Sequence, residues 1–366
     1  MTRVRLVVLY YRGTENATLS YQHGWPEHLV RAPAMDVDGV NLARRGDRLL
    51  LRAAGRRRLD RADAIVMLHS VFSNECMLSP ALTRVLASVS TPKVFFIGNE
   101  YKLMPEKMRF AESVGVSLLV SQLTSPAAHA LYRARLACEV VGIPNTGFDP
   151  TLFASRTRFS SRPVDIGYRS FASPLYLGHD ERRELAARVA ETAERHGLST
   201  DISLATADRF DEAGWAGFLN RCRGQIGTEA GGDLFELTDE TRNRVNAYLD
   251  SRPAATFAEI HSRFFADREE TISGRAISGR VVEAAATKTV QLLLEGEYGG
   301  LFLPDVHYIP VHKDFSNLEE ALDRLGDDRV CLELTENGYE LALREFTYTQ
   351  LIERFRSALE LVIQRA

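Results

Sequence analysis

The chain has 366 residues, of which 45% are hydrophobic and 26% charged, the composition of a soluble globular protein. Its length is sufficient for two domains of ordinary size, and its net charge of −4 gives no general attraction to nucleic acid or to an anionic membrane. No apolar run approaches the roughly 18 to 20 residues of a membrane span. Composition therefore predicts no transmembrane segment and no nucleic-acid partner.

The start of the chain and its cysteines predict a cytoplasmic protein. Met1 leads almost directly into a predicted strand, without the basic, apolar and cleavage regions of a secretory signal. The four cysteines are scattered and form no CxxC or Cys/His cluster, so we expect them to be reduced and not to bind a metal.

Short apolar runs alternate with longer amphipathic stretches in the first 145 residues. The runs have the length and β-branched content of buried parallel strands; they are 4–10, 64–68, 93–97, 116–120 and 138–143. The stretches 79–87 and 105–114 have the pattern of amphipathic helices. Repeated alternation of this kind is typical of a doubly wound α/β sheet.

A second alternation follows the turn-rich segment 144–150. It contains a charged helix at 180–196, and its predicted strands are 164–169, 201–204, 224–227, 289–294 and 307–311. The last stretch places Leu351, Phe355 and Leu359 on one helical face, which indicates a packing helix. The sequence thus predicts two Rossmann-like domains, with boundaries set at 1–155, 156–345 and 346–366 for the terminal helix.

Residues 277–300 have the order loop, helix, strand and loop, which suits a nucleotide pocket. Ser278 and Gly279 can open a helix whose free amides attract phosphate. Arg280 brings a guanidinium group suited to phosphate oxygens, and Glu283 lies about one turn later, within reach of a ribose hydroxyl. The alternative is that Glu283 only favours the helix dipole and that Arg280 is a surface charge.

The order and spacing of several segments make the chain similar to the GT-B glycosyltransferases, in particular the bacterial group with a family 1 type C-terminal domain. The segments are 93–101, 143–153, 164–169, 227–233, 278–286, the loop from 295, and 305–317. The resemblance implies two Rossmann-like domains facing a cleft. It also implies that the C-terminal domain holds a nucleoside diphosphate sugar, that the acceptor approaches from the N-terminal domain, and that the last helix can cross back.

The resemblance carries over to single residues with two departures. Retaining relatives have two glutamates eight positions apart, and Glu283 matches the second, which contacts the ribose. Arg275 stands where the first would be, so the pair is broken. Lys288 replaces the glycine that usually ends this helix, and a left-handed backbone there would cost on the order of 1 kcal/mol.

Further donor-binding residues are predicted around this helix. A diphosphate leaving group needs its negative charge neutralised, and the resemblance implies that basic side chains and helix dipoles do so without a metal or another cofactor. Arg280 is the first candidate, Arg169 the second, and Arg275 a third; a surface salt bridge is the alternative for Arg169. Three other candidates each have a structural alternative as turn or packing residues, namely Gly231, Gly232 and Tyr298.

Three residues after predicted strands are candidates for catalysis. His69 is expected to point into the cleft, where it resembles a histidine of many GT-B enzymes that contacts the donor sugar or acts as a base. Glu100 is the other candidate base, which an inverting reaction requires and a retaining one does not. Glu229 could bind sugar hydroxyls or stabilise positive charge at the anomeric carbon. Purely structural roles are the alternative for each.

The sequence therefore predicts a metal-independent glycosyltransferase that uses a UDP-sugar or a related donor. Its acceptor would be a hydroxyl of a small molecule, a glycan or a lipid-linked precursor. An epimerase or hydrolase of the same fold and a non-catalytic sugar-nucleotide-binding protein stay open as alternatives. The donor base, the sugar, the acceptor, the stereochemical outcome and the oligomeric state are not specified by the sequence.

Overall fold

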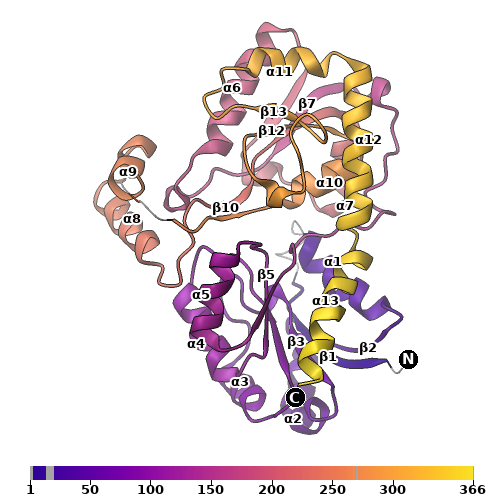
Figure 1. Ribbon diagram of the computed structural model, residues 1–366, viewed down its shortest axis with the longest axis vertical. Helices are drawn as coiled ribbons and strands as arrows, with labels where there is room; N and C mark the ends of the chain where they lie inside the picture. The colour runs from indigo at the N-terminus through magenta and orange to yellow at the C-terminus, as the bar shows by residue number, and fades with distance from the viewer. Residues whose placement is uncertain (1–2, 14–19, 267, 269–270, 366) are drawn as a thin grey trace.

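The computed structural model describes residues 3–13, 20–266, 268 and 271–365, and it consists of two lobes that are each built on a parallel sheet (Figure 1). The first sheet has the strand order β2-β1-β3-β4-β5-β6. Its strands are β1 Val4–Tyr10, β2 Met35–Asn41, β3 Ala64–Met67, β4 Lys93–Phe96, β5 Leu118–Ser121 and β6 Glu139–Gly142. The helices between them are α1 Ser20–Arg31, α2 Arg45–Leu59, α3 Pro80–Ala87, α4 Met104–Val114 and α5 Pro126–Leu136.

The second sheet has the order β13-β12-β9-β7-β8, again with parallel neighbours. Its strands are β7 Val164–Arg169, β8 Thr200–Ser203, β9 Cys222–Gly227, β12 Val290–Leu294 and β13 Ile309–Val311. Its helices are α6 Glu181–Arg195, α7 Glu212–Arg221, α10 Gly279–Ala286, α11 Leu318–Leu325 and α12 Asp328–Glu345. The predicted α/β architecture with two doubly wound domains is confirmed.

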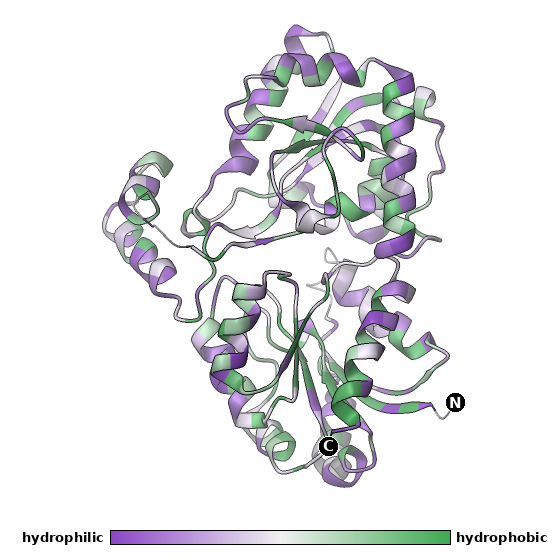
Figure 2. Ribbon diagram, in the orientation of Figure 1, coloured by the Kyte–Doolittle hydropathy of each residue, from purple (hydrophilic) through white to green (hydrophobic). Residues whose placement is uncertain are grey.

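Both faces of each sheet are buried, as the apolar runs of the sequence require. In β1, Val7 and Leu9 belong to one core cluster, whereas Leu6 and Val8 belong to another on the opposite face. This separation follows from the alternation of side chains along a strand. Hydrophobic colour accordingly marks much of the strands in both lobes, while the helices carry hydrophobic and hydrophilic colour in alternation (Figure 2).

The chain crosses between the lobes twice, and the two crossings lie side by side. Residues 143–163 connect β6 to β7, and the chain returns after α12 to form α13 Tyr348–Ile363 on the first lobe (Figure 1). The amide of Phe148 donates to the carbonyl of Phe346 at 3.0 Å. The apolar face of α13 packs into the first-lobe core, where the rings of Phe355 and Phe96 are 5.1 Å apart.

One feature of the second lobe has no counterpart in the predicted elements. Strands β10 Ala230–Gly232 and β11 Gly274–Ala276 pair antiparallel. Between them lie α8 Glu240–Ser251 and α9 Phe257–Phe264, which project beside the gap between the lobes (Figure 1). We call the described residues of this segment, 233–266, 268 and 271–273, the arm. No helix in the described part of the chain is both long enough and apolar enough to cross a membrane.

Candidate functional site

A cavity of about 380 Å³ lies between the lobes, at the carboxyl ends of strands from both sheets. Asn99 and Gln122 follow β4 and β5 of the first lobe, and Arg169 ends β7 of the second. Open α/β sheets bind ligands at these strand ends. The position and size of the cavity therefore make it the candidate site.

Three of the arginines that line this cavity form a group in which neighbouring ones repel each other. Arg182, Arg209 and Arg280 form no ion pair with any carboxylate in the described ranges 3–13, 20–266, 268 and 271–365. Burial, followed by repulsion from a neighbouring arginine, lowers the pKa of Arg182 and of Arg209, and burial lowers that of Arg280. Positive charges gathered in this way make the cavity wall attractive to an anion.

Arg182 is the most constrained of the three. It is only 6% exposed, and its Nη1 atom is buried without a hydrogen-bond acceptor. The guanidinium carbon lies 4.7 Å from the ring centre of Phe171, a favourable cation–π distance. An oxyanion in the cavity would supply the missing acceptor.

The start of α10 adds the partial positive charge of a helix N-terminus to the same wall. Ser278 precedes the helix with an extended backbone, and its hydroxyl makes no capping hydrogen bond. Gly279 lies so close to Thr146 of the interlobe connection that a Cβ atom would be 2.7 Å from the threonine methyl group. Ser278, Gly279 and Arg280 all line the cavity.

Two carboxylates face the cavity close to each other. Glu283 is 4% exposed, and its Oε2 accepts a hydrogen bond of 2.7 Å from Nε1 of Trp215. Glu212 begins α7, and burial together with the charge of Glu283 raises its pKa to about 7. The tryptophan orients the carboxylate of Glu283 at the cavity wall, where a carboxylate is able to accept from a ligand hydroxyl.

The first-lobe wall is polar and uncharged apart from one lysine. No carboxylate or histidine is found among the described residues that line it. They are Tyr21, Ser73, Asn74, Asn99, Tyr101, Lys102, Gln122, Asn145 and Thr146.

His69 does not point into the cleft as expected. It lies beneath the wall, with its ring between those of Tyr21 and Phe96 at 5.5 and 5.1 Å, and it is 2% exposed. Burial lowers its pKa to about 3, so the imidazole is neutral at physiological pH. The position supports the structural alternative, in which His69 packs against the back of Tyr21.

Glu100 also turns away from the cavity. Its carboxylate accepts hydrogen bonds from the hydroxyls of Ser121 and Tyr132 and from the amide of Gln122. Burial raises its pKa. With 2% exposure it ties the loop after β4 to β5 and α5, and it has no access to an acceptor hydroxyl.

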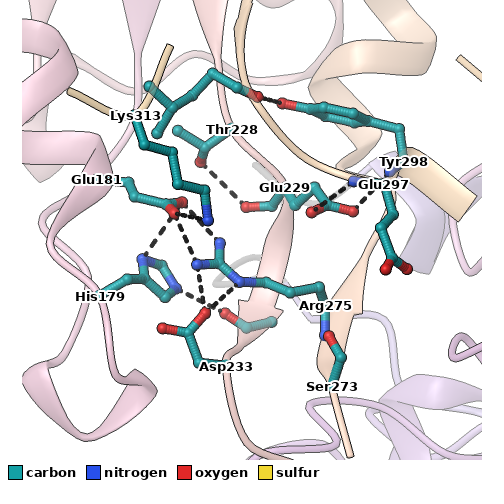
Figure 3. Close-up of polar contacts among 12 residues, drawn as sticks. His179, Glu181, Thr228, Glu229, Asp233, Ser273, Arg275, Glu297, Tyr298 and Lys313 are labelled. Atoms are coloured by element: carbon teal, nitrogen blue, oxygen red, sulfur yellow. Dashed lines mark hydrogen bonds and ion pairs between the residues drawn. The ribbon is translucent and has the colours of Figure 1, made fainter. Parts of the chain in front are cut away.

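Glu229 and Tyr298 contact each other and do not line the cavity (Figure 3). Glu229 accepts from the amide of Tyr298 at 2.8 Å, and burial raises the pKa of this carboxylate. The Tyr298 hydroxyl donates to the carbonyl of Leu294 at 2.6 Å, and its side chain is fully buried. Both residues hold the loop after β12 in place, so the expected sugar or base contacts are not available to them.

Arg275 is enclosed by carboxylates rather than facing a phosphate (Figure 3). Its guanidinium makes two hydrogen bonds to Glu181, at 2.7 and 2.8 Å, and another to Asp233 at 2.8 Å. Gly231, its partner in the β10–β11 pair, lines the cavity, whereas Gly232 does not. Gly231 has φ +83°, and a Cβ atom there would overlap the carbonyl of Gly274, which supports the turn alternative.

Arg169 lies at the cavity but is already paired. Its Nη2 donates to Asp201 at 2.6 Å, and its guanidinium stacks on Phe218. Sequence reasoning missed Arg182, Arg209, Glu212 and Trp215. One signal was available for Arg182, because it lies three residues before Leu185 on the apolar face of α6, where an unpaired charge is unusual.

Comparison with solved structures finds glycosyltransferases. No protein-family model and no curated protein matches the chain. A glycosyltransferase from Rickettsia africae ESF-5 is 9% identical over the full length of both chains, with a TM-score of 0.52. Anabaena Alr3699/HepE in complex with UDP-glucose is 12% identical over 98% of this chain and all of that one, with a TM-score of 0.51.

The chain has the GT-B fold. It spans 58% of the length of TarM, which matches 84% of this chain at 10% identity with a TM-score of 0.48. In this GT-B chain the carboxyl edges of the two sheets meet at the cavity.

Proposed function

We propose that the chain is a metal-independent glycosyltransferase that moves a sugar from a nucleoside diphosphate sugar to an acceptor hydroxyl in the interlobe cavity. One observation carries the proposal: Arg182, Arg209 and Arg280 line the cavity with no carboxylate partner among the described residues. Three guanidinium groups and a helix N-terminus match the charge of a diphosphate. The Alr3699/HepE structure with UDP-glucose supports UDP as the first nucleotide to test.

These groups would act on the departing diphosphate. During transfer the bond from the anomeric carbon to the phosphate oxygen breaks, and negative charge grows on that oxygen. Arg280 and Arg182, together with the first-turn amides of α10, are placed to stabilise this charge without a metal ion. Glu283, oriented by Trp215, would accept hydrogen bonds from the ribose hydroxyls.

The first-lobe wall suits an acceptor with several hydroxyl groups. The amides of Asn74, Asn99 and Gln122 each offer both donors and an acceptor, as paired sugar hydroxyls require. Tyr21 and Tyr101 offer aromatic surface beside them. A small sugar, a glycan end or a sugar on a lipid carrier has this chemistry.

Titration calorimetry with UDP tests the donor site. Arg182→Ala and Arg280→Ala should each weaken UDP binding by about 10- to 100-fold, the equivalent of one lost charge-assisted hydrogen bond. Arg183→Ala is the matched control, because Arg183 is exposed and pairs with Asp180. Failure of the native protein to bind any nucleoside diphosphate, or an equal loss in Arg183→Ala, contradicts the proposal.

The surroundings of Arg275 favour a second candidate, sugar-nucleotide binding without transfer. Arg275 stands where retaining relatives have a glutamate, so this position provides no carboxylate for a donor sugar. The guanidinium group of Arg275 forms ion pairs with Glu181 and Asp233. UDP-sugar that stays intact across a broad panel of acceptors would identify this function. Donor consumption without any acceptor would instead indicate an epimerase or a hydrolase.

A further inference from the structure

The arm is an insertion in the second lobe, but its first residues contact the first lobe. It leaves the donor side of the cavity at Gly231, whose backbone lines that cavity. Asp233, the first arm residue, is fixed there by Arg275 (Figure 3). Because the arm starts at the second-lobe wall, any contact that it makes with the first-lobe wall links the two walls of the cavity.

The contacts converge on the loop 98–103, which forms part of the first-lobe wall. Asn99, Tyr101 and Lys102 of this loop line the cavity. Asn99 and Leu103 have φ angles of 49° and 56°, in the left-handed region that costs a non-glycine residue on the order of 1 kcal/mol. A loop of this shape needs contacts that hold it.

One set of contacts comes from inside the first lobe. The ammonium group of Lys107, fully buried, donates to the carbonyls of Gly98, Asn99 and Lys102 at 2.6, 2.9 and 2.8 Å. Three donors match three carbonyls, which fixes the loop backbone from below.

The other set comes from the arm. Oδ2 of Asp239 accepts from the amide of Leu103 at 2.6 Å, and Oδ1 accepts from the amide of Met104 at 3.2 Å. Leu103 occupies the N-cap position of α4 and has no side-chain capping hydrogen bond. Asp239 of the other lobe thus supplies the cap, and it is itself only 4% exposed.

Phe235 makes the second arm contact, behind the same wall. It is 2% exposed within the first-lobe core, with its ring 5.2 Å from that of Tyr132. The Tyr132 hydroxyl donates to Glu100, which in turn accepts from the amide of the cavity residue Gln122. The arm therefore supports both the loop 98–103 and the wall residue next to it.

We propose that the arm is an interlobe latch and that Asp239 is a positioning residue, which holds the loop 98–103 in its binding shape from the donor lobe. The contacts that form the latch are present in the structure. That the loop they hold binds the acceptor rests on the proposed function.

Hydrogen exchange measured by mass spectrometry on the full chain without ligand tests the latch. Asp239→Ala should raise exchange in residues 98–104 by about tenfold, the usual cost of a lost N-cap, and leave β12 unchanged. Asp250→Ala is the control, since Asp250 is exposed on the same arm and its side chain makes no hydrogen bond or ion pair within the described chain. Unchanged exchange at 98–104 in Asp239→Ala overturns the latch.

Two further measurements keep the result decisive. If Asp239→Ala exchanges faster throughout the chain, Asp239→Asn, which keeps one acceptor oxygen, is used instead. Faster exchange confined to 98–104 in this variant supports the latch, and unchanged exchange there overturns it. UDP binding should change by less than about twofold in these variants, because the loop 98–103 belongs to the wall proposed for the acceptor and not to the wall that carries Arg182 and Arg280. Loss of UDP binding in the native protein would overturn the proposed function and leave the exchange result standing.

Discussion

Glu212 is a carboxylic acid whose charge should change close to neutral pH. Its pKa is raised to about 7 by burial and by the carboxylate of Glu283, with Glu27 and Asp149 adding to the effect and Arg12 opposing it. The folded-state pKa lies above that of an ordinary glutamate, so the stability that protonated Glu212 contributes is lost as pH rises towards 7. Ionisation also places another negative charge in a cavity proposed to bind a diphosphate.

We therefore expect UDP affinity to fall as pH rises from 6 to 8, and Glu212→Gln to remove that part of the fall. The ratio of the native to the variant Kd should rise by about 3- to 10-fold across this range. UDP itself titrates in this range, but equally for both proteins, so the ratio isolates Glu212. A constant ratio would show that Glu212 does not change charge there.

At the residue scale, local sequence signals worked where the relevant partners are close in sequence. Ser278, Gly279, Arg280 and Glu283 line the cavity because one helix start, with its preceding strand, determines their direction. For residues that follow other strands, segments distant in the sequence determine where the side chain points.

His69 and Glu100 illustrate this dependence on distant segments. Tyr21 from α1 covers His69, and Tyr132 from α5 captures Glu100. A pattern read along one strand contains neither partner. The side chains that reach the cavity beside them, Asn99 and Gln122, could be recognised only once the sheet was assembled.

At the element scale, the end of α10 is a point of strain. Lys288 has φ 51°, the left-handed conformation at which a relative's glycine would be unstrained. Its ammonium group pairs with Glu336 and lies 4.6 Å from the ring centre of Tyr339, which offsets part of the backbone cost.

Replacing Lys288 by glycine and by alanine separates these effects. Both variants lose the contacts with Glu336 and Tyr339, so only the backbone preference distinguishes them. We expect Lys288→Gly to be more stable than Lys288→Ala by about 1 kcal/mol in urea denaturation. Equal stability of the two variants would show that the left-handed turn carries no strain.

The elements themselves were predictable where burial gives a uniform pattern. The runs at 4–10, 64–68 and 290–294 are buried on both faces and match strands of the structure. Strand β2 was missed because it contains Asp36 and Asp38 and lies at the edge of its sheet, partly exposed. The arm was missed because helical periodicity does not reveal that two helices are inserted between paired strands.

At the scale of the whole molecule, the first lobe completes its core with chain segments that lie far along the sequence. The first lobe needs α13 from the C-terminus, and its core also takes up Phe235 of the arm. The lobes are therefore joined by the connection 143–163, the return to α13 and the arm. Such connections favour unfolding of the two lobes in one transition. When one lobe loses core packing, we expect that lobe to unfold before the other.

The two tryptophans allow this to be measured, because Trp25 lies in the first-lobe core and Trp215 in the second. Trp215→Phe leaves Trp25 to report on the first lobe, and Trp25→Phe leaves Trp215 to report on the second. The fluorescence of these two proteins should change at the same urea concentration. Phe355→Ala should destabilise the first lobe by about 3–5 kcal/mol and move the Trp25 transition ahead of the Trp215 transition, because Phe355 is fully buried against Phe96.

Phe302→Ala is the mirror control for this experiment. Phe302 is 1% exposed in the second-lobe core and stacks on Phe346, so its loss should move the Trp215 transition first. Equal shifts of both probes in both variants would mean that the lobes unfold as one unit even when damaged. In that case the three connections, rather than the separate cores, would set the stability of this chain.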